Sequence, residues 1–388
     1  MKLAQKLKSL VLVTISGTGV FAGVCIYKGN EKFYRNIVMP AVHMLDPETT
    51  HTLGIIANKY NLFPKSYYED PPSLKVNIFG REYSNPVGIA AGFDKQAEAI
   101  VGLHQLGFGF VEIGSVTPEP QPGNSKPRVF RLPEDQAVIN RYGFNSDGHE
   151  KIYQRLESLK HTQFTGIIGV NLGKNKNSPN GINDYVQGIE KFGHVADYLV
   201  INISSPNTPG LRTLQNRQML HDLLSTIVIA RNNLPIAHRP PILVKLAPDL
   251  SWEEKRDIAD VLKCRECQVD GLIVCNTTVE RSPELKNSEY VNERGGLSGK
   301  PLTDRSTEMI AEMYKLTNGM TIIGVGGVFS GKDAYDKIKA GASLVQVYTA
   351  FVYQGPPCAT RIKRELAELL QADGYTNVSE AVGVDKNK

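Results

Sequence analysis

Cysteine is scarce in this 388-residue chain, which has five cysteines, an odd number scattered along its length. Such a set argues against the disulfide framework of a small secreted protein. Cys264 and Cys267 form one C-x-x-C pair, but a zinc ribbon needs a second pair, which the sequence lacks. We therefore interpret the pair as two free thiols on a helix.

The sequence also lacks an excess of charge of either sign, with 44 Lys and Arg residues against 40 Asp and Glu residues. It has no basic stripe interleaved with aromatic residues, which argues against a nucleic-acid partner. His, Asp and Glu do not recur at the spacing of metal ligands, so we expect no metal site. No G-x-G-x-x-G fingerprint follows a predicted strand, which argues against a dinucleotide cofactor.

The N-terminal segment has no acidic residue before Glu31, and three lysines precede an uncharged run over residues 10–27. This run of 18 residues is at the short end for a membrane-spanning helix. Three interpretations compete: a cleaved secretory signal, a mitochondrial import signal joined to a membrane anchor, and a plain buried helix. The basic, acid-free start favours the second. We therefore predict that residues 1–30 target the protein to the mitochondrion and anchor it in a membrane.

Residues 31–68 have the pattern of two short amphipathic helices. Pro40 breaks the first, and Asp46 and Pro47 suit the N-cap and the first position of the second. Beside a membrane anchor, these helices could lie in the membrane interface. They could equally cap the main domain, and the pattern alone does not separate the two.

From residue 87 onward, short apolar runs alternate with helical patterns. The runs cover residues 87–90, 110–114, 167–171, 198–202, 242–246, 271–275, 321–325 and 344–348. The helical patterns include residues 96–106, 215–232, 251–263, 304–316, 331–340 and 357–371. This alternation predicts an α/β fold, and the count of eight favours a (β/α)8 TIM barrel over an open doubly wound sheet. We assign the barrel to residues 69–373 and expect the polar tail, residues 374–388, to be disordered.

The longest excursion between predicted strands covers residues 115–165 and follows the second strand. It contains two strand-like runs, residues 128–132 and 137–139. In a barrel, this excursion would cover the catalytic mouth.

The fourth predicted strand ends in a polar cluster, since residues 202–208 read Asn-Ile-Ser-Ser-Pro-Asn-Thr. Asn is disfavoured within strands, and a buried amide is costly unless its hydrogen bonds are met. We therefore expect these groups to bind something polar and planar. Ser205 lies in the middle, before the stiff Pro206. Because barrel active sites lie at the C-terminal ends of the strands, the cluster predicts a site of chemistry.

Glycine-rich turns follow the last two predicted strands, and residues 324–327 read Gly-Val-Gly-Gly. Such turns match the phosphate cradle of this architecture. Residues 295–299 add a second flexible loop, and Lys245 ends the fifth strand. Together they indicate one phosphate and one aromatic heterocycle, which flavin mononucleotide (FMN) fits better than a dinucleotide.

Five motifs follow one another along the predicted barrel: residues 90–95 (Ala-Ala-Gly-Phe-Asp-Lys), 140–145 (Asn-Arg-Tyr-Gly-Phe-Asn), 202–208, 295–299 (Gly-Gly-Leu-Ser-Gly) and 324–328 (Gly-Val-Gly-Gly-Val). Over about residues 31–372, the chain resembles class 2 dihydroorotate dehydrogenase. The resemblance implies an FMN enzyme that oxidises (S)-dihydroorotate to orotate in de novo pyrimidine (UMP) biosynthesis. Its electrons would pass to a ubiquinone-type quinone in the mitochondrial inner membrane, with residues 31–68 forming the quinone tunnel. We expect a monomer with a single N-terminal anchor.

The resemblance also implies roles for individual residues. Ser205 would be the catalytic base that takes the proton from C5 of the substrate. The cofactor would be held by Ala90, Ala91, Gly92, Ser115, Asn171, Asn202, Lys245, Cys275, Gly299, Gly327, Tyr348 and Thr349. The substrate would be held by Lys95, Asn140, Arg141, Tyr142, Gly143, Phe144, Asn202, Asn207, Asn276 and Thr277. The quinone would be met by His51, Arg131 and Tyr348.

Cys275 stands where the family pattern has Thr, which is mild if the contact is made by backbone but loses a hydroxyl if it is made by the side chain. Ser205 is a poor base at its own pKa, and we suggest Thr208 and an ordered water as its relay. Without the resemblance, His51 would be interpreted as a satisfied helix histidine.

Two other functions compete with this one. A 2-hydroxy acid oxidase would need a His base and an Arg for the carboxylate, and the strand ends lack such a pair. A membrane-tethered nucleotide-binding module would leave Ser205 and the ring of Asn residues unexplained. Serine rather than the cysteine of class 1 relatives at position 205, together with the helical module and anchor, points to a quinone acceptor.

Overall fold

Eight apolar segments form the parallel strands of a closed barrel. The structure, a computed structural model, describes residues 3–286 and 289–385. The barrel strands are β3 (Val87–Ile89), β4 (Phe110–Val116), β7 (Ile167–Leu172), β8 (Tyr198–Asn202), β9 (Ile242–Leu246), β10 (Gly271–Val274), β12 (Thr321–Val325) and β13 (Ala342–Val347). Because β13 pairs with β3, the sheet closes on itself. The predicted barrel is confirmed, and the open doubly wound sheet is excluded.

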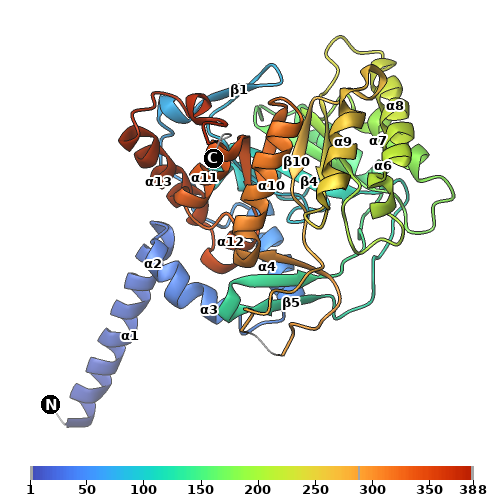
Figure 1. Cartoon of the computed structure of the whole chain (residues 1–388). Helices are drawn as coiled ribbons and strands as arrows, with labels where there is room; N and C mark the ends of the chain where they lie inside the picture. The colour runs from blue at the N-terminus through green and yellow to red at the C-terminus, as the bar shows by residue number, and fades with distance from the viewer. Residues whose placement is uncertain (1–2, 287–288, 386–388) are drawn as a thin grey trace.

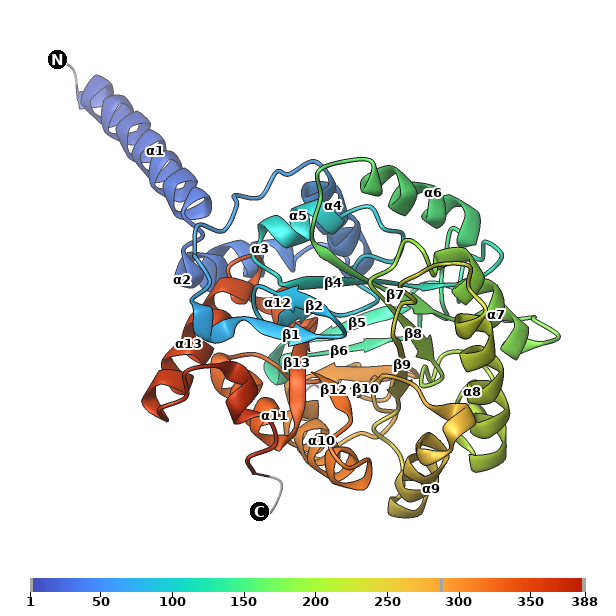
Figure 2. The same ribbon diagram turned by 90° about the horizontal axis from the view of Figure 1, so that it is seen from above.

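Helices surround the barrel, as Figures 1 and 2 show. They are α5 (Ile100–Gln105), α6 (His149–Lys160), α7 (Gly181–Phe192), α8 (Arg217–Asn232), α9 (Trp252–Lys263), α10 (Thr303–Leu316), α11 (Gly331–Ala340), α12 (Thr349–Gln354) and α13 (Cys358–Ala372). Strands covered in this way are buried on both faces, which explains why they are continuous apolar runs. A short hairpin of β1 (Val76–Ile78) and β2 (Arg81–Tyr83) lies across one end of the barrel (Figure 2). Cys264 and Cys267 are free, just beyond the end of α9.

A small antiparallel sheet is formed by β5 (Val129–Leu132), β6 (Ala137–Asn140) and β11 (Gly296–Gly299). The two strand-like runs of the long excursion are thereby confirmed. The prediction of a flexible loop at residues 295–299 is wrong, because Gly296–Gly299 pairs with β6. Gly296 is needed for close packing, since a Cβ there would lie 1.9 Å from Thr277 Oγ1. The glycines therefore serve close approach within a strand rather than flexibility.

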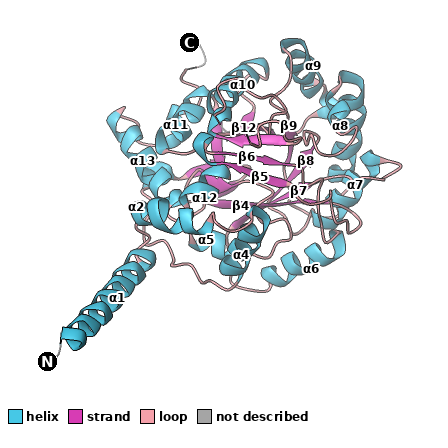
Figure 3. Cartoon of the chain, turned by 90° about the horizontal axis from the view of Figure 1, so that it is seen from below, coloured by secondary structure: helices cyan, strands magenta, loops and turns pink. Residues whose placement is uncertain are grey.

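Helix α1 (Leu3–Tyr27) extends away from the barrel, as Figures 1 and 3 show. At about 1.5 Å per residue its length is roughly 37 Å, enough to cross a hydrocarbon core. By length and composition, its segment Gln5–Tyr27 is a candidate membrane span, and only 6% of the apolar window is buried. The alternative of a buried core helix is therefore excluded.

The helical module after α1 contains α2 (Glu31–Phe33), the π-helical turn η1 (Tyr34–Val38), α3 (Met39–Val42) and α4 (Pro47–Lys59). The π turn precedes Pro40, which has no N–H to continue an α-helical ladder. As predicted, the Asp46 side chain caps α4 by accepting from Thr49 N, with Pro47 at the first position. The module packs on the barrel through a hydrogen bond from His43 Nε2 to Val352 O at 2.9 Å.

The C-terminal segment folds onto the barrel, so the expectation of disorder is wrong for residues 374–385. Val378 and Ala381, in the turn η7 (Val378–Ala381), are fully buried. Gly383 N donates to Ile338 O at 3.1 Å. Two buried apolar side chains in a polar segment therefore dock it, together with polar contacts such as that of Asn377 Nδ2 with Lys75 O at 2.9 Å. Residues 386–388 lie outside the described part of the chain.

Candidate active site

One cavity of about 430 Å³ begins between α3 and α4 and continues to the C-terminal ends of the barrel strands. This volume is in the range of small-molecule and cofactor sites. Predicted site residues that line the cavity are Ala90, Ala91, Gly92, Lys95, Ser115, Asn140, Tyr142, Gly143, Phe144, Asn202, Ser205, Asn207, Lys245, Cys275, Asn276, Thr277, Gly299, Gly327, Tyr348 and Thr349, together with His51 and Arg131 at the helical end. Residues far apart in the sequence therefore meet around one space.

Two predicted residues do not line it. Arg141 follows β6, and side chains alternate in direction there, so its guanidinium turns away and pairs with Glu293 while donating to Pro127 O at 2.8 Å. Asn171 lies one layer below the cavity, where it accepts a hydrogen bond from Ser115 Oγ. Asn171 therefore supports a lining residue, and Arg141 forms part of the outer rim.

Ser205 lies in the loop after β8 and is only 7% exposed. Its Oγ accepts from Asn207 N at 3.3 Å. Asn207 Nδ2 in turn donates to Asn140 O, at the end of β6, at 3.1 Å. The loop that holds the serine is thus tied to the small sheet.

An amide network forms the floor beside Ser205. Asn202 Nδ2 donates to Ser115 Oγ at 2.9 Å. Asn276 Nδ2 donates to Ser204 Oγ at 2.9 Å and more weakly to Asn202 Oδ1 at 3.3 Å. Since each amide offers both donors and acceptors, this floor suits a planar imide ring.

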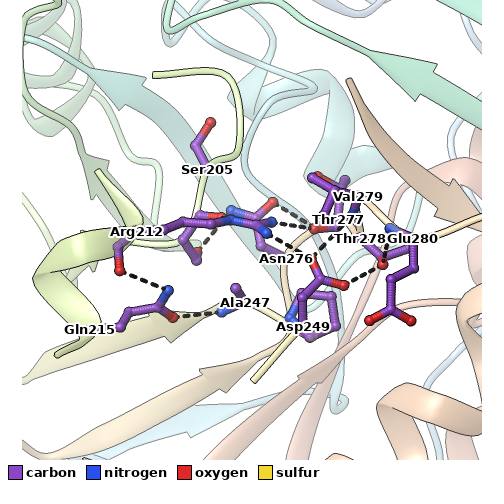
Figure 4. Close-up of polar contacts among 12 residues, drawn as sticks. Ser205, Arg212, Gln215, Ala247, Asp249, Asn276, Thr277, Thr278, Val279 and Glu280 are labelled. Atoms are coloured by element: carbon purple, nitrogen blue, oxygen red, sulfur yellow. Dashed lines mark hydrogen bonds and ion pairs between the residues drawn. The ribbon is translucent and has the colours of Figure 1, made fainter. Parts of the chain in front are cut away.

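Arg212 connects the loops that carry these groups, as Figure 4 shows. It donates to Ser204 O at 3.0 Å and to Thr277 O at 2.9 Å, and it pairs with Asp249 at 2.6 Å. Asp249 also accepts from Thr278 Oγ1. Ser205 projects away from this cluster (Figure 4). The sequence analysis did not identify Arg212 or Asp249 as site residues. Asp249 lies shortly after β9, so its place at a strand end was an available signal.

Lys95 lines the cavity, and no ion pair among the described residues includes it. Its Nζ donates to Gly92 O and lies 4.1 Å from the centre of the Tyr142 ring. Burial, helped by the nearby Arg128 guanidinium, lowers the pKa of Lys95 to about 7. The lysine therefore offers a positive charge that only an anionic ligand would fully compensate.

Lys245 lies deeper, at the end of β9, where it is 5% exposed. Its Nζ is 3.8 Å from Glu112 Oε1. Glu112 was also missed by sequence reasoning. The one available signal was a single acidic residue inside the otherwise uncharged strand β4.

The turn after β12 forms a cradle of backbone groups. Gly326 and Gly327 have φ values of +116° and +68°, and a Cβ on Gly327 would lie 2.1 Å from Thr303 Oγ1. Ser298 and Thr349 hydroxyls meet at 2.9 Å nearby. Cys275 directs its thiol to Val325 O at 3.8 Å, and burial raises the pKa of that thiol to about 12, so it stays neutral. This backbone-rich cradle is suited to a phosphate.

The helical end of the cavity is apolar, with Val38, Val42, Leu53 and Phe63 in its lining. Two polar groups stand out there. His51 Nε2 lies 2.7 Å from Phe93 O, and burial, followed by the charge of Lys95, lowers the pKa of His51 to about 3.

Arg131 is the second polar group, and it donates to His43 O at 3.0 Å. Its Nη1 is buried with no hydrogen-bond partner among the described residues. Tyr348 OH donates to Gly92 O at 3.2 Å and so connects this end with the barrel mouth. The helical end therefore combines an apolar wall with one unsatisfied cationic donor.

Comparison with known proteins shows what this arrangement is similar to. The family model described as "Dihydroorotate dehydrogenase" matches residues 73–370. A mouse protein named "Dihydroorotate dehydrogenase (quinone), mitochondrial" is 52% identical over 384 residues, covering 97% of this chain and 96% of its own length. A Parvibaculum lavamentivorans protein named "Dihydroorotate dehydrogenase (quinone)" is 49% identical, covering 90% of this chain and 98% of its own length. The crystal structure of ligand-free DHODH from Eimeria tenella matches with a TM-score of 0.85 at 46% identity, covering 88% of this chain and all of that one.

Proposed function

This chain belongs to the dihydroorotate dehydrogenase family, and we propose that it oxidises (S)-dihydroorotate to orotate in pyrimidine biosynthesis and passes the electrons to a quinone. The observation that carries the proposal is the single cavity that joins a polar barrel mouth to an apolar helical end. The polar barrel mouth suits a charged imide substrate, and the apolar helical end suits a quinone. The relatives' names include the quinone as acceptor.

At the barrel mouth, we assign the substrate ring to the amides of Asn140, Asn207 and Asn276. Their donors and acceptors can match those of a cyclic imide without adding net charge. Lys95 would meet the substrate carboxylate, which supplies the negative charge that its burial demands. Arg212 keeps the Ser205 loop and the Thr277 loop in a fixed relation, as required for a substrate held between them.

FMN fits the remaining part of the cavity. Gly326 and Gly327 line the cavity with positive φ values, and their backbone groups would receive the phosphate. Lys245, Ser115 and Asn202 would hold the heterocycle through their buried donors. When bound, FMN supplies hydride acceptance from the substrate and electron transfer to a second acceptor. Lys245 lines the cavity and would stabilise the negative charge that the cofactor gains on reduction.

Ser205 is our candidate for the base that removes the substrate proton. Its hydroxyl needs a path by which the proton can leave. Thr208 Oγ1 is buried and has no hydrogen-bond partner among the residues that the structure describes. A water bound to this hydroxyl would complete a relay, because buried polar groups normally find a partner. Thr208→Val should therefore slow flavin reduction while FMN content stays at wild-type level. An unchanged rate would refute the relay.

The helical end is our candidate quinone site, with Arg131 and His51 as its polar groups. Helix α1 would anchor the protein in the mitochondrial inner membrane and bring that end of the cavity to the lipid. The exposed apolar side chains of Ile37, Leu53 and Ile56 on the helical module support this orientation.

The proposal is tested by absorption spectroscopy of the purified full-length protein. We expect a flavin spectrum that dihydroorotate bleaches and added quinone restores, with lactate as a control that leaves it unchanged. Ser205→Ala should lower the rate of bleaching by about 10² to 10⁴ while binding of orotate persists. A protein without flavin, or one bleached equally well by lactate, would refute the proposed function.

A further inference from the structure

Glu112 is a fully buried carboxylate in the interior of the barrel, and two residues that it contacts, Gln346 and Lys245, line the cavity. Glu112 lies on β4, and groups from four other strands converge on it. Asn171 Nδ2 donates to its Oε1 at 2.8 Å. Gln346 Nε2 and Tyr198 OH donate to its Oε2 at 2.6 and 3.2 Å.

This set of contacts is more than the packing of the barrel requires. A barrel interior is ordinarily filled by branched apolar side chains, and a buried charge is costly unless donors surround it. Here three neutral donors hold the carboxylate in one place. Residues of β7, β8 and β13 therefore fix the position of the Glu112 carboxylate.

The position of the Glu112 carboxylate matters because it lies near Lys245, which is on β9. Lys245 Nζ lies 3.8 Å from Glu112 Oε1, close enough for an ion pair but beyond ordinary hydrogen-bond distance. Glu112 thus balances the charge of the lysine without occupying its N–H groups. Those groups stay available to the cavity, which Lys245 lines.

We propose that Glu112 is a positioning residue that holds Lys245 toward the cofactor and sets the reduction potential of the bound flavin. This inference rests on the proposed function, in which Lys245 faces FMN. Reduction brings negative charge to the site, which the positive charge of Lys245 favours, and the pairing of Lys245 with Glu112 weakens that effect. Glu112 therefore keeps the potential lower than an unpaired lysine would set it.

The decisive experiment is the midpoint potential of the flavin in the full-length holoenzyme, measured by equilibration with a reference dye. Glu112→Gln keeps the shape of the side chain and removes its charge. We expect the ratio of reduced to oxidised flavin at a fixed potential to rise at least tenfold, a shift of about 30 mV for two electrons. A potential equal to that of the wild type would overturn the proposal.

Two further variants separate charge from packing. Tyr198→Phe removes one hydrogen bond to the same carboxylate but leaves the charge, so its ratio should change less than threefold. In a Lys245→Met background, Glu112→Gln should have less than half its original effect, because the lysine through which it acts is gone. An equal effect in both backgrounds would show that Glu112 does not act through Lys245.

Loss of flavin from Glu112→Gln would leave Glu112→Asp to decide, since aspartate keeps the charge but withdraws it from Lys245. The flavin potential of Glu112→Asp should rise, but by less than the shift of about 30 mV expected for a neutral residue, and an unchanged potential would refute the proposal. Tyr335→Phe, which removes a hydrogen bond to Asp373 on the outside of the barrel, controls for general destabilisation. Absence of flavin from the wild-type protein would instead refute the proposed function.

Discussion

Replacing Lys95 by methionine should make the protein more stable and less able to bind its substrate. In the folded protein, burial and the neighbouring Arg128 lower the pKa of Lys95 from 10.5 to about 7. Its Nζ donates to Gly92 O and faces the Tyr142 ring, and no ion pair found between the described residues includes it. The buried positive charge of Lys95 therefore destabilises the folded protein, and only a bound anion would compensate it.

The magnitude follows from the shift in pKa. Each unit corresponds to about 1.4 kcal/mol, so a charged Lys95 lowers the free energy of unfolding by at most about 5 kcal/mol. Between pH 7 and 10.5 the unfolded chain binds more protons than the folded one, so stability rises with pH in this window. From pH 6.5 to 8.5 the wild type should gain about 2 kcal/mol relative to Lys95→Met, by the same linkage.

The assay is urea unfolding of both proteins in detergent across this pH range. Lys95→Met should be the more stable variant near pH 6.5, and its advantage should shrink as pH rises. Lys75→Met is the matched control, because Lys75 is exposed and, among the residues that the structure describes, forms an ion pair only with the exposed Glu82. A difference between wild type and Lys95→Met that does not change with pH would refute the reasoning. The value of kcat/KM for dihydroorotate should fall about 10- to 100-fold in the same variant, as expected for loss of a charged hydrogen bond.

Three further predictions concern other parts of the molecule. Arg131→Met should raise the KM for quinone about tenfold and leave flavin reduction by dihydroorotate unchanged in stopped-flow measurements, since Arg131 lies at the helical end; slower flavin reduction would contradict this. Arg212→Lys cannot hold Ser204 O, Thr277 O and Asp249 together, so it should raise the KM for dihydroorotate about tenfold, whereas Arg217→Lys, at an exposed ion pair, should not. Removal of residues 1–27 should move the protein from the membrane to the soluble fraction in cell fractionation while dihydroorotate still bleaches its flavin, and retention in the membrane would show a second anchor.

The predictions from sequence succeeded where the information is local. Each barrel strand is buried on both faces, so its apolar run marks it within a few residues, and polar residues directly after the run mark its C-terminal end. The sequence pattern therefore predicts that Ser205 and Asn276 lie at one mouth of the barrel. Asp46 and Pro47 likewise begin α4 through contacts within one turn.

Only the tertiary structure could decide what depends on partners distant in the chain. The glycine-rich sequence of β11 is typical of a flexible loop, but its hydrogen bonds with β6 make it a strand. The polar C-terminal segment is ordered because Val378 and Ala381 are buried against the barrel. Glu112 and Lys245 lie on strands separated in the barrel, and closure of the sheet is what brings their charges within 3.8 Å. The sequence by itself determined which strands form and where chemistry gathers, since those are set by local burial and backbone preference. Tertiary structure decided which charges meet, because that requires the register and closure of the whole barrel.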